Sequence, residues 1–261
     1  MTEWQLRELM CEVGRRTWHR GFVASSDGNF SCRLDEKRIL ATPTMMSKGF
    51  LEPRDLVIVD NEGKRVSGER NVTSEIRMHL RCYNQRPDVR ACVHAHPPHA
   101  TAYAIVQEPV PKCVMPEAEV FLGEVPIVPY AHPGTWEFGE ALDPYLPDFN
   151  VFLLASHGAL AIGGDLLEAY HRMETVDHYC RILINVQSIG QAKPLTRDAM
   201  ERLFETKRNL GIPDRRLRED VGPSCDVPSP APTVSKPPEK PKSDTVDRVV
   251  DAVLEKIERQ R

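Results

Sequence analysis

Residues 89–106, which read VRACVHAHPPHATAYAIV, decide the fold of this 261-residue chain. Residues 89–94 form a short, mostly apolar run, which is typical of a strand buried in a sheet. Pro97 and Pro98 follow directly, and proline is favoured in the first turn of a helix because its fixed φ suits that position. We therefore expect residues 97–106 to form a helix. A buried strand that leads straight into a helix is typical of an α/β domain.

The alternation of strands and helices extends to both sides of this stretch. Apolar residues at helical spacing predict helices at residues 4–20, 73–83 and 166–189. Short apolar runs bounded by turn residues predict strands at residues 29–34, 38–42, 55–60, 125–129 and 150–155. Helices and strands interleaved around one sheet indicate a layered α/β domain, although the pattern does not give the order of the strands.

The composition changes sharply near residue 222. Residues 222–242 contain seven prolines in 21 positions, which leaves almost nothing to bury and predicts a disordered Pro-rich linker. Residues 243–261 carry one apolar stripe at helical spacing, made of Val246, Val249, Val250, Val253, Leu254 and Ile257. The stripe predicts an amphipathic helix beyond the linker. The globular domain is therefore expected at residues 1–221.

The charge balance limits the classes of partner. The chain has 34 Lys and Arg residues against 38 Asp and Glu residues, a formal net charge of -4. A nucleic-acid partner is not expected, because binding to a phosphate backbone needs a concentrated basic face. No stretch approaches the roughly 18 apolar residues of a membrane-spanning helix, and the first residues lack the apolar run of a signal peptide. We expect a cytoplasmic protein with no membrane partner.

The histidines carry the candidate chemistry. His94 and His96 end the strand at residues 89–94, and residues i and i+2 of a strand point to the same face. His157 follows the strand at residues 150–155, where Gly158 is expected to let the chain turn sharply. Three histidines with an open fourth position are the usual ligands of a catalytic divalent metal, and imidazole suits zinc or a neighbouring transition ion. A single histidine at a strand end is more often structural.

A second group of candidate residues opens the helix at residues 73–83. The hydroxyls of Thr73 and Ser74 lie beside the free N–H groups of a helix start, which favours an anion. Glu75 offers a carboxylate that serves as a base or a ligand, although the simpler interpretation of the three residues is a plain helix cap. The turns at Gly28-Asn29 and Thr42-Pro43-Thr44 add donors for a phosphate. Lys48 lies close enough in sequence to add charge, and its simpler interpretation is an exposed loop lysine.

Six motifs in this order resemble the class II aldolase and epimerase family over about residues 5 to 215. They are Gly28-Asn29-Phe30-Ser31, Thr42-Pro43-Thr44, Thr73-Ser74-Glu75, His94-Ala95-His96, Pro129-Tyr130 and Ser156-His157-Gly158. The resemblance implies a three-layer α/β/α subunit in a homotetramer, with the sites at subunit interfaces. It also implies that His94, His96 and His157 bind the metal, normally Zn2+, and that Glu75 is a fourth ligand and the general base.

The resemblance also implies the substrate. Five residues would hold a substrate phosphate: Gly28, Asn29, Thr44, Thr73 and Ser74. The activity would be the cleavage of a ketose 1-phosphate, such as fuculose or rhamnulose 1-phosphate, to dihydroxyacetone phosphate and an aldehyde such as lactaldehyde. Displacement of Glu75 from the metal by substrate would free it as a base, and a hydrophobic wall would raise its pKa toward neutrality. The alternatives are a sugar-phosphate 4-epimerase or decarboxylase on the same metal site, or a non-catalytic assembly protein.

The sequence departs from the family's pattern at three places, one of which is the aldolases' C-terminal tyrosine, which has no counterpart in this chain. Met45 stands where the aldolases have a glycine in the phosphate loop, and methionine does not tolerate a glycine-only conformation. The aldolases also use a tyrosine, contributed across the subunit interface, as a proton donor, but residues 110–126 contain no tyrosine. Met115 lies roughly where that tyrosine is expected, and the nearby acids are Glu117 and Glu119. Pro116-Glu117 followed by Leu122-Gly123 resembles a variant of the family, which implies that Glu117 approaches the metal or acts as the acid. The simpler interpretation of Glu117 is a solvated surface glutamate.

The C-terminal extension resembles a known kind of targeting segment. A Pro-rich linker followed by a short helix with a Val/Leu/Ile stripe is similar to the encapsulation peptides that direct enzymes into bacterial microcompartments. This resemblance implies that residues 243–261 dock on a microcompartment shell protein. The implied location is the cytoplasm, inside a bacterial microcompartment. A protein shell that retains a reactive aldehyde such as lactaldehyde would fit the expected chemistry.

Overall fold

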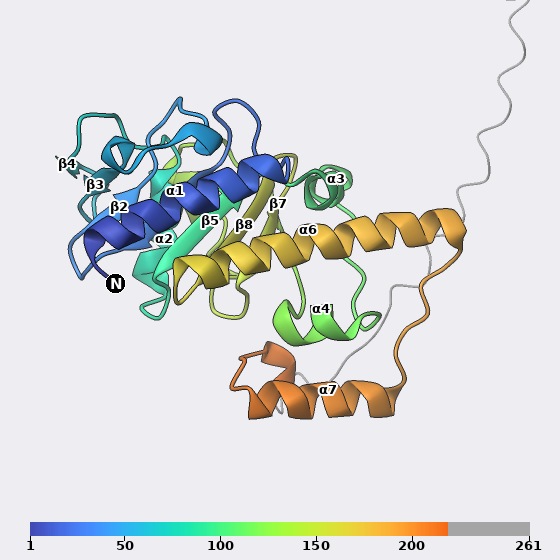
Figure 1. Ribbon diagram of the computed structural model, residues 1–261. Coiled ribbons are helices and arrows are strands. Elements are labelled where there is room, and N and C mark those ends of the chain that lie inside the picture. Colours follow the sequence, from blue (N-terminus) through green and yellow to red (C-terminus); the bar gives the residue numbers. More distant parts are fainter. Residues whose placement is uncertain (219–261) are drawn as a thin grey trace, which may run out of the picture. The chain divides into compact units, whose positions relative to one another are not determined.

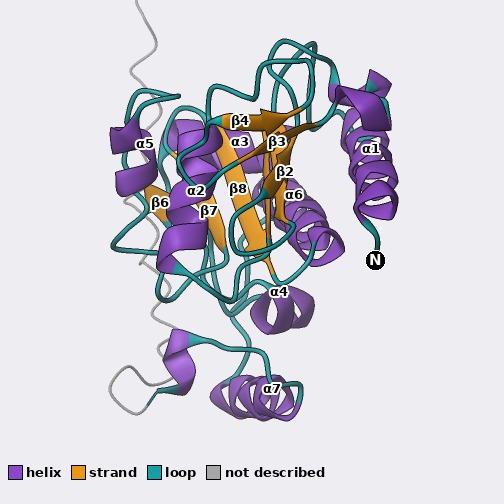
Figure 2. Cartoon of the chain, turned by 90° about the vertical axis from the view of Figure 1, so that its left-hand side faces the viewer, coloured by secondary structure: helices purple, strands orange, loops and turns teal. Residues whose placement is uncertain are grey.

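The computed structural model describes residues 1–218, and its centre is one eight-stranded sheet (Figures 1 and 2). The strands lie in the order β4-β3-β2-β1-β5-β8-β7-β6. Neighbouring strands are antiparallel, except that β6 and β7 are parallel. The strands are β1 Asn29–Arg33, β2 Ile39–Ala41, β3 Val57–Val59, β4 Arg65–Ser67, β5 Ala91–Ala95, β6 Ile127–Val128, β7 Val151–Leu154 and β8 Gly158–Gly163.

Helices cover both faces of this sheet. The α-helices are α1 Glu3–His19, α2 Ile76–Gln85, α3 Pro98–Val106, α4 Pro116–Phe121, α5 Trp136–Glu140, α6 Leu166–Ile189 and α7 Arg197–Asn209. Figure 2 shows α1 and α6 on one side of the sheet and α2 and α5 on the other. Three short 3-10 helices complete the described part: η1 Lys48–Phe50, η2 Pro53–Asp55 and η3 Arg215–Leu217.

Alternating strand residues build one hydrophobic core on each face. In β5, Ala91 and Val93 pack with residues of α1, α3 and α6, whereas Cys92 packs with residues of α2 and α5. This alternation follows from the two-residue period of a strand, and burial on both faces explains why β5 reads as a nearly continuous apolar run. The structure confirms the predicted three-layer α/β/α fold.

Two of the local differences between the predictions and the structure affect the candidate site. The first helical residue of α2 is Ile76, not Thr73, because Glu75 has φ -93° and ψ 12° and caps the helix instead of entering it. The strand β8, which the sequence analysis did not predict, forms a hairpin with β7 and lies between β7 and β5. Its residues GALAIG are a short apolar run between glycines, and such a run does not distinguish a strand from a helix segment.

Five cysteines are buried free thiols, namely Cys11, Cys32, Cys82, Cys92 and Cys180, whereas Cys113 is disulfide-bonded. Within the described residues, no helix combines the length and the apolar character needed to cross a membrane. The predicted linker at residues 222–242 and the predicted helix at residues 243–261 lie outside the described residues.

Candidate active site

The order of the strands brings the candidate residues to one edge of the sheet. β5 lies between β1 and β8 and is antiparallel to both, so its C-terminal end meets the first residues of its two neighbours. Asn29 is directly opposite His94 in the β1–β5 pair. Leu160 is opposite His94 in the β5–β8 pair, and the β7–β8 turn with His157 is therefore adjacent. Segments separated by more than 60 residues of sequence thus build one site.

The three histidines converge through their Nε2 atoms. The His94 Nε2 atom lies 3.3 Å from that of His96 and 3.1 Å from that of His157. Two ligands of a tetrahedral ion with bonds of 2.0–2.1 Å lie about 3.3 Å apart, so the observed spacing fits a metal centre. Within residues 1–218, this trio is the only cluster of three or more His, Cys, Asp or Glu side chains with such spacing. These residues can therefore hold a divalent ion.

The partner of His94 fixes which ring nitrogen is free. His94 Nδ1 lies 2.8 Å from the backbone carbonyl oxygen of Ala159, which only accepts hydrogen bonds, so Nδ1 carries the proton and donates it. Complete burial lowers the pKa of His94 to about 3 and keeps the ring neutral. The Nε2 lone pair therefore points toward the other two histidines, as a metal ligand requires.

The carboxylate of Asp27 lies next to the His96 ring. Its Nδ1 atom lies 3.5 Å from Asp27 Oδ2, and a carboxylate in this position orients a metal-binding imidazole. Burial lowers the pKa of His96 as well. Neither Asp27 nor the Ala159 carbonyl was expected from the sequence to contact these histidines. Asp27 directly precedes the Gly28-Asn29 motif, which is the one signal that could have found it.

Glu75 lies beside the histidines at the start of α2. Its carboxylate oxygens are 3.3 Å from His94 Nε2 and 3.1 Å from His157 Nε2, and Asn29 Nδ2 donates to Oε2 at 2.7 Å. Burial raises the pKa of this carboxyl, but His94, His157 and Asn29 outweigh burial and hold it well below its usual range. The low pKa belongs to the carboxylate in contact with these partners, whereas the expected rise concerns Glu75 after substrate has displaced it and stays a prediction.

The turn that presents His157 differs from the expected one. Ser156, not Gly158, has the left-handed conformation, with a φ of 57°. Gly158 is required for a different reason: a Cβ atom there would lie 2.5 Å from His96 Cδ2 and 2.6 Å from the Ala95 carbonyl oxygen. The absence of a side chain at Gly158 therefore leaves the space in which His96 sits.

Gly158→Ala should disturb the metal site without removing a ligand. The added methyl group must push His96 away, and a displacement of about 1 Å in a catalytic site can reduce activity roughly 100-fold. We expect a similar loss in kcat together with a lower metal content, measured by elemental analysis. Gly190→Ala is the matched control, because nothing lies within 4 Å of its new Cβ. Normal metal content and activity in Gly158→Ala would contradict the observed packing.

The structure brings the segments with the predicted phosphate ligands together. Backbone hydrogen bonds join Thr73 N to Thr42 O and Thr44 N to Asn71 O, so the second and third motifs lie side by side. Thr73 and Asn29 are buried, and the buried Asn29 Oδ1 has no hydrogen-bond partner in the described structure. The other predicted donors, Gly28, Thr44 and Ser74, are more accessible.

Gly28 lies where the fold leaves no room for a side chain. Its φ is 68°, and a Cβ atom would lie 2.6 Å from Val23 Cγ1 and 2.8 Å from the His94 carbonyl oxygen. Met45, in contrast, adopts a left-handed conformation with a φ of 56° although it has a side chain, which is 81% exposed. A non-glycine residue in this conformation costs about 1 kcal/mol, so the loop keeps the backbone shape that a glycine would take.

The two acids near the missing tyrosine have different surroundings. Glu119 is buried and pairs with Arg216, whose Nη1 donates to Oε2 at 2.8 Å, so this acid is part of an ion pair within the fold. Glu117 is exposed on α4. Within residues 1–218, Glu117 forms no hydrogen bond or ion pair with the three histidines, so the single subunit does not bring it to them.

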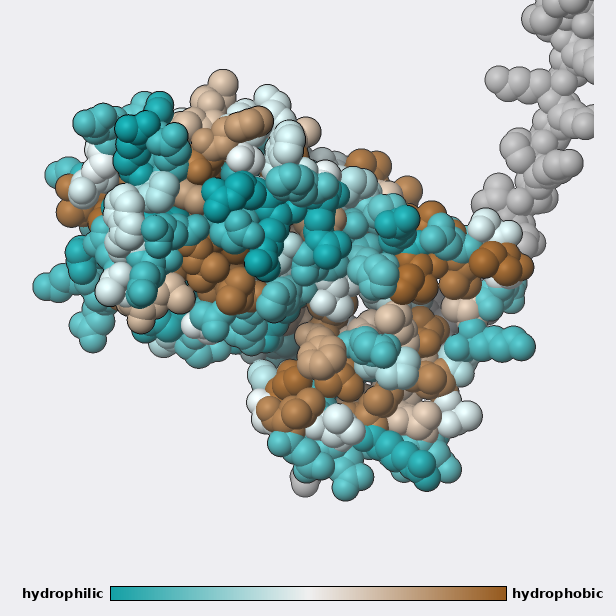
Figure 3. Space-filling view, in the orientation of Figure 1, coloured by the Kyte–Doolittle hydropathy of each residue, from teal (hydrophilic) through white to brown (hydrophobic). Residues whose placement is uncertain are grey.

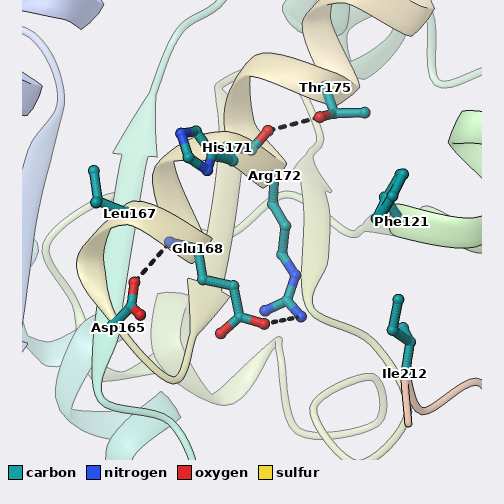
Figure 4. A pocket seen from close by; sticks show the side chains of 8 residues that line it. All are labelled: Phe121, Asp165, Leu167, Glu168, His171, Arg172, Thr175 and Ile212. Carbon is teal, nitrogen blue, oxygen red and sulfur yellow. Dashed lines mark hydrogen bonds and ion pairs between the residues drawn. The ribbon is translucent and has the colours of Figure 1, made fainter. Parts of the chain in front are cut away.

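A cavity of about 470 Å³ lies along the first half of α6, and it differs from the histidine site. Figure 4 shows Arg172 reaching toward Glu168, with Asp165 and Thr175 at the same wall. Glu168 pairs with Arg172, Asp165 accepts from the Glu168 backbone, and Thr175 donates to a backbone oxygen. The polar groups of this wall therefore already have ion-pair or hydrogen-bond partners within the protein, and none of them is a predicted site residue.

Comparisons with known proteins identify the family of this chain. Residues 8–184 match the family described as Class II Aldolase and Adducin N-terminal domain. A 3-oxo-tetronate 4-phosphate decarboxylase from Haemophilus influenzae is 32% identical over 72% of this chain and 90% of its own length. An L-fuculose phosphate aldolase from Methanococcus vannielii is 34% identical over 63% of this chain and 88% of its own length.

A solved structure shows the same likeness. YgbL from Klebsiella pneumoniae superimposes with a TM-score of 0.72 at 33% identity, over 78% of this chain and 99% of that protein. The likeness therefore extends over nearly the whole of YgbL. With a family match over most of its described residues, this chain belongs to the class II aldolase family.

Proposed function

We propose that this protein is a zinc-dependent aldolase that cleaves a ketose 1-phosphate to dihydroxyacetone phosphate and an aldehyde. The observation that supports this most directly is the convergence of His94, His96 and His157 next to the carboxylate of Glu75. The three imidazoles would hold the ion. The bound ion would supply Lewis-acid stabilisation of the negative charge that develops on the substrate oxygens as the carbon–carbon bond breaks.

The residues of the chain supply the proton transfer and the binding of the substrate. Glu75 would move a proton on the three-carbon fragment, because it is a buried carboxylate beside the metal-binding nitrogens. Asn29 would orient this carboxylate through the hydrogen bond to Oε2. Gly28, Asn29, Thr44, Thr73 and Ser74 would hold the phosphate and thereby place the bond that breaks.

A decarboxylase is the second candidate, and the named relatives favour it as much as an aldolase. Loss of CO2 from 3-oxo-tetronate 4-phosphate and aldol cleavage of a ketose 1-phosphate both leave the enediolate of dihydroxyacetone phosphate. The same stabilisation of negative charge therefore suits both reactions. The bond that breaks depends on the group attached to the enediolate carbon, which is a carboxylate in one substrate and a hydroxyalkyl group in the other. The residues proposed to hold the three-carbon phosphate would serve either reaction, so the products formed must distinguish the two.

The test is to incubate the full-length zinc-loaded protein with fuculose 1-phosphate, rhamnulose 1-phosphate, 3-oxo-tetronate 4-phosphate and ribulose 5-phosphate. Equal amounts of dihydroxyacetone phosphate and lactaldehyde from either of the first two would support the aldolase. Dihydroxyacetone phosphate with CO2 from the third would replace it with the decarboxylase. An epimer of ribulose 5-phosphate would indicate a 4-epimerase. No product from any of the four would favour a non-catalytic assembly protein.

We also propose that the protein is a homotetramer in which Glu117 acts as an acid in the site of a neighbouring subunit. Support comes from the exposed position of Glu117 and from the apolar surface around it. On the face seen in Figure 3, hydrophobic side chains gather over α4, α7 and the C-terminal half of α6. Phe121 on α4, Ile189 on α6 and Leu210 directly after α7 are 53%, 86% and 58% exposed. Sedimentation velocity on the full-length protein tests the tetramer.

The proposed role of the C-terminal extension is targeting. Residues 243–261 would dock on a shell protein of a bacterial microcompartment, and residues 222–242 would act as the spacer. Deletion of residues 222–261 should leave kcat and the oligomeric state unchanged but abolish co-sedimentation with shells, and Val250→Glu with Leu254→Glu should do the same. Loss of activity or of the tetramer in the deletion variant would instead show that the extension serves the enzyme itself.

A further inference from the structure

Lys48 is a buried cation that the proposed mechanism does not yet use. Only 1% of its surface is exposed, although the simpler interpretation of the sequence is an exposed loop lysine. Its Nζ donates to the carbonyl oxygens of Ser26 at 2.8 Å and Met46 at 2.6 Å. Ser26 lies two residues before Gly28, and Met46 lies two residues after Thr44. The ammonium therefore joins the two loops that carry predicted phosphate ligands.

This ammonium lacks an anionic partner within residues 1–218. It forms no salt bridge there, and its third N–H has no acceptor among the described residues. The nearest carboxylates, Asp27 and Glu75, already contact histidines. A buried charge without a counter-charge is costly, and burial lowers the pKa of Lys48 to about 8. A buried ammonium group is therefore normally paired with an anion.

The five predicted phosphate ligands carry no charge of their own. Gly28, Asn29, Thr44, Thr73 and Ser74 offer N–H and O–H donors, whereas a phosphate ester brings one to two negative charges to a partly buried site. The neighbouring Ser47 hydroxyl is also buried without a partner in the described structure. Lys48 has no ion-pair partner and the Ser47 hydroxyl has no hydrogen-bond partner among the described residues, and both lie beside neutral phosphate ligands. Together they indicate an anion site at the junction of the two loops.

We propose that Lys48 is the cation of the phosphate site and makes the enzyme selective for phosphorylated substrates. The inference rests on the proposed function, because that function requires a phosphate between these loops. A purely structural role, in which Lys48 only ties the two loops together, is the competing explanation. The two roles differ in that a tie needs hydrogen-bond donors, whereas a phosphate partner needs charge.

Lys48→Gln separates the two roles, because an amide keeps donors for the two carbonyls but removes the charge. The dissociation constant of inorganic phosphate is measured by calorimetry on the full-length zinc-loaded protein. Loss of a charge-assisted contact should raise it about 10- to 100-fold, and KM for the cleaved ketose phosphate should rise in parallel while zinc content stays constant. Lys48→Met, which loses donors and charge, should bind phosphate as weakly. Lys37→Met is the matched control, because it removes one exposed positive charge.

A phosphate dissociation constant within twofold of wild type in zinc-loaded Lys48→Gln would overturn the inference. Because the binding assay needs no turnover, weakened phosphate binding without cleavage of any ketose phosphate would refute the proposed function and leave the role of Lys48 intact. If neither variant folds, wild type is measured from pH 7 to 9.5. Phosphate binding should weaken over this range as Lys48 loses its proton. Unchanged affinity would count against the inference.

Discussion

His96→Ala should lose its metal and its activity together. Removal of one of the three imidazoles leaves two histidines beside the Glu75 carboxylate, and a site that lacks one of its three histidine ligands rarely retains its ion. Replacement of a residue that merely orients a ligand already costs about 10- to 100-fold in metal affinity, so we expect a loss of more than about 100-fold here. The metal content of the purified variant and its turnover after incubation with excess zinc measure the two effects.

His178→Ala is the control for this variant, because His178 is an exposed histidine of α6. It should retain the metal and the activity of the wild type. If His96→Ala were fully active while free of metal, the three histidines would not form the catalytic centre. Retention of metal with loss of activity would give His96 a different role, as a group that contacts the substrate.

Glu75→Gln should retain metal and lose most of its turnover. The amide has nearly the shape of the carboxylate, so Asn29 Nδ2 can still donate to an oxygen at this position. It cannot accept the proton, however, and removal of a positioned base typically costs about 10²- to 10⁴-fold in rate. We expect this loss in kcat with bound metal largely preserved, measured by steady-state kinetics and elemental analysis on the same preparation.

Glu62→Gln, a change at an exposed glutamate, controls for the loss of one negative charge. A Glu75→Gln enzyme within a few-fold of wild type would show that Glu75 is only the cap of α2. The pKa of Glu75 lies below its usual range because of His94, His157 and Asn29. In the absence of substrate, this residue should therefore stay ionised throughout the range in which the protein is assayed.

The sequence pattern was sufficient for the layered fold but not for the connections within the sheet. The apolar run of β5 and the proline start of α3 are local features, and the structure has both where the sequence predicts them. The hairpin from β7 to β8 was missed, because residues 158–163 are apolar without a helical or strand period. That hairpin is what places Ala159 opposite Ala95 and supplies the carbonyl partner of His94.

Contacts with residues that are distant in sequence explain what the sequence alone did not show at the site. Lys48 looked like a surface lysine because its neighbours in sequence are those of a loop, and its burial depends on Ser26 in another loop and on packing against Gly14 of α1. The direction of the Glu75 pKa likewise depends on His94 and His157, which are distant in sequence. Residue types and spacing therefore indicated which groups carry the chemistry, whereas the electrostatics of each group required its three-dimensional neighbours.

Metal analysis of the full-length wild-type protein is the most direct measurement of whether the three histidines form a catalytic divalent-metal site. We predict about one divalent ion per subunit after purification without chelator, loss of activity when a chelator removes it, and recovery when zinc is restored. X-ray absorption on the zinc-loaded protein should show imidazole ligands at about 2.0–2.1 Å. A metal-free protein that catalyses the same reaction at full rate in the presence of chelator would contradict the metal site and the chemistry derived from it.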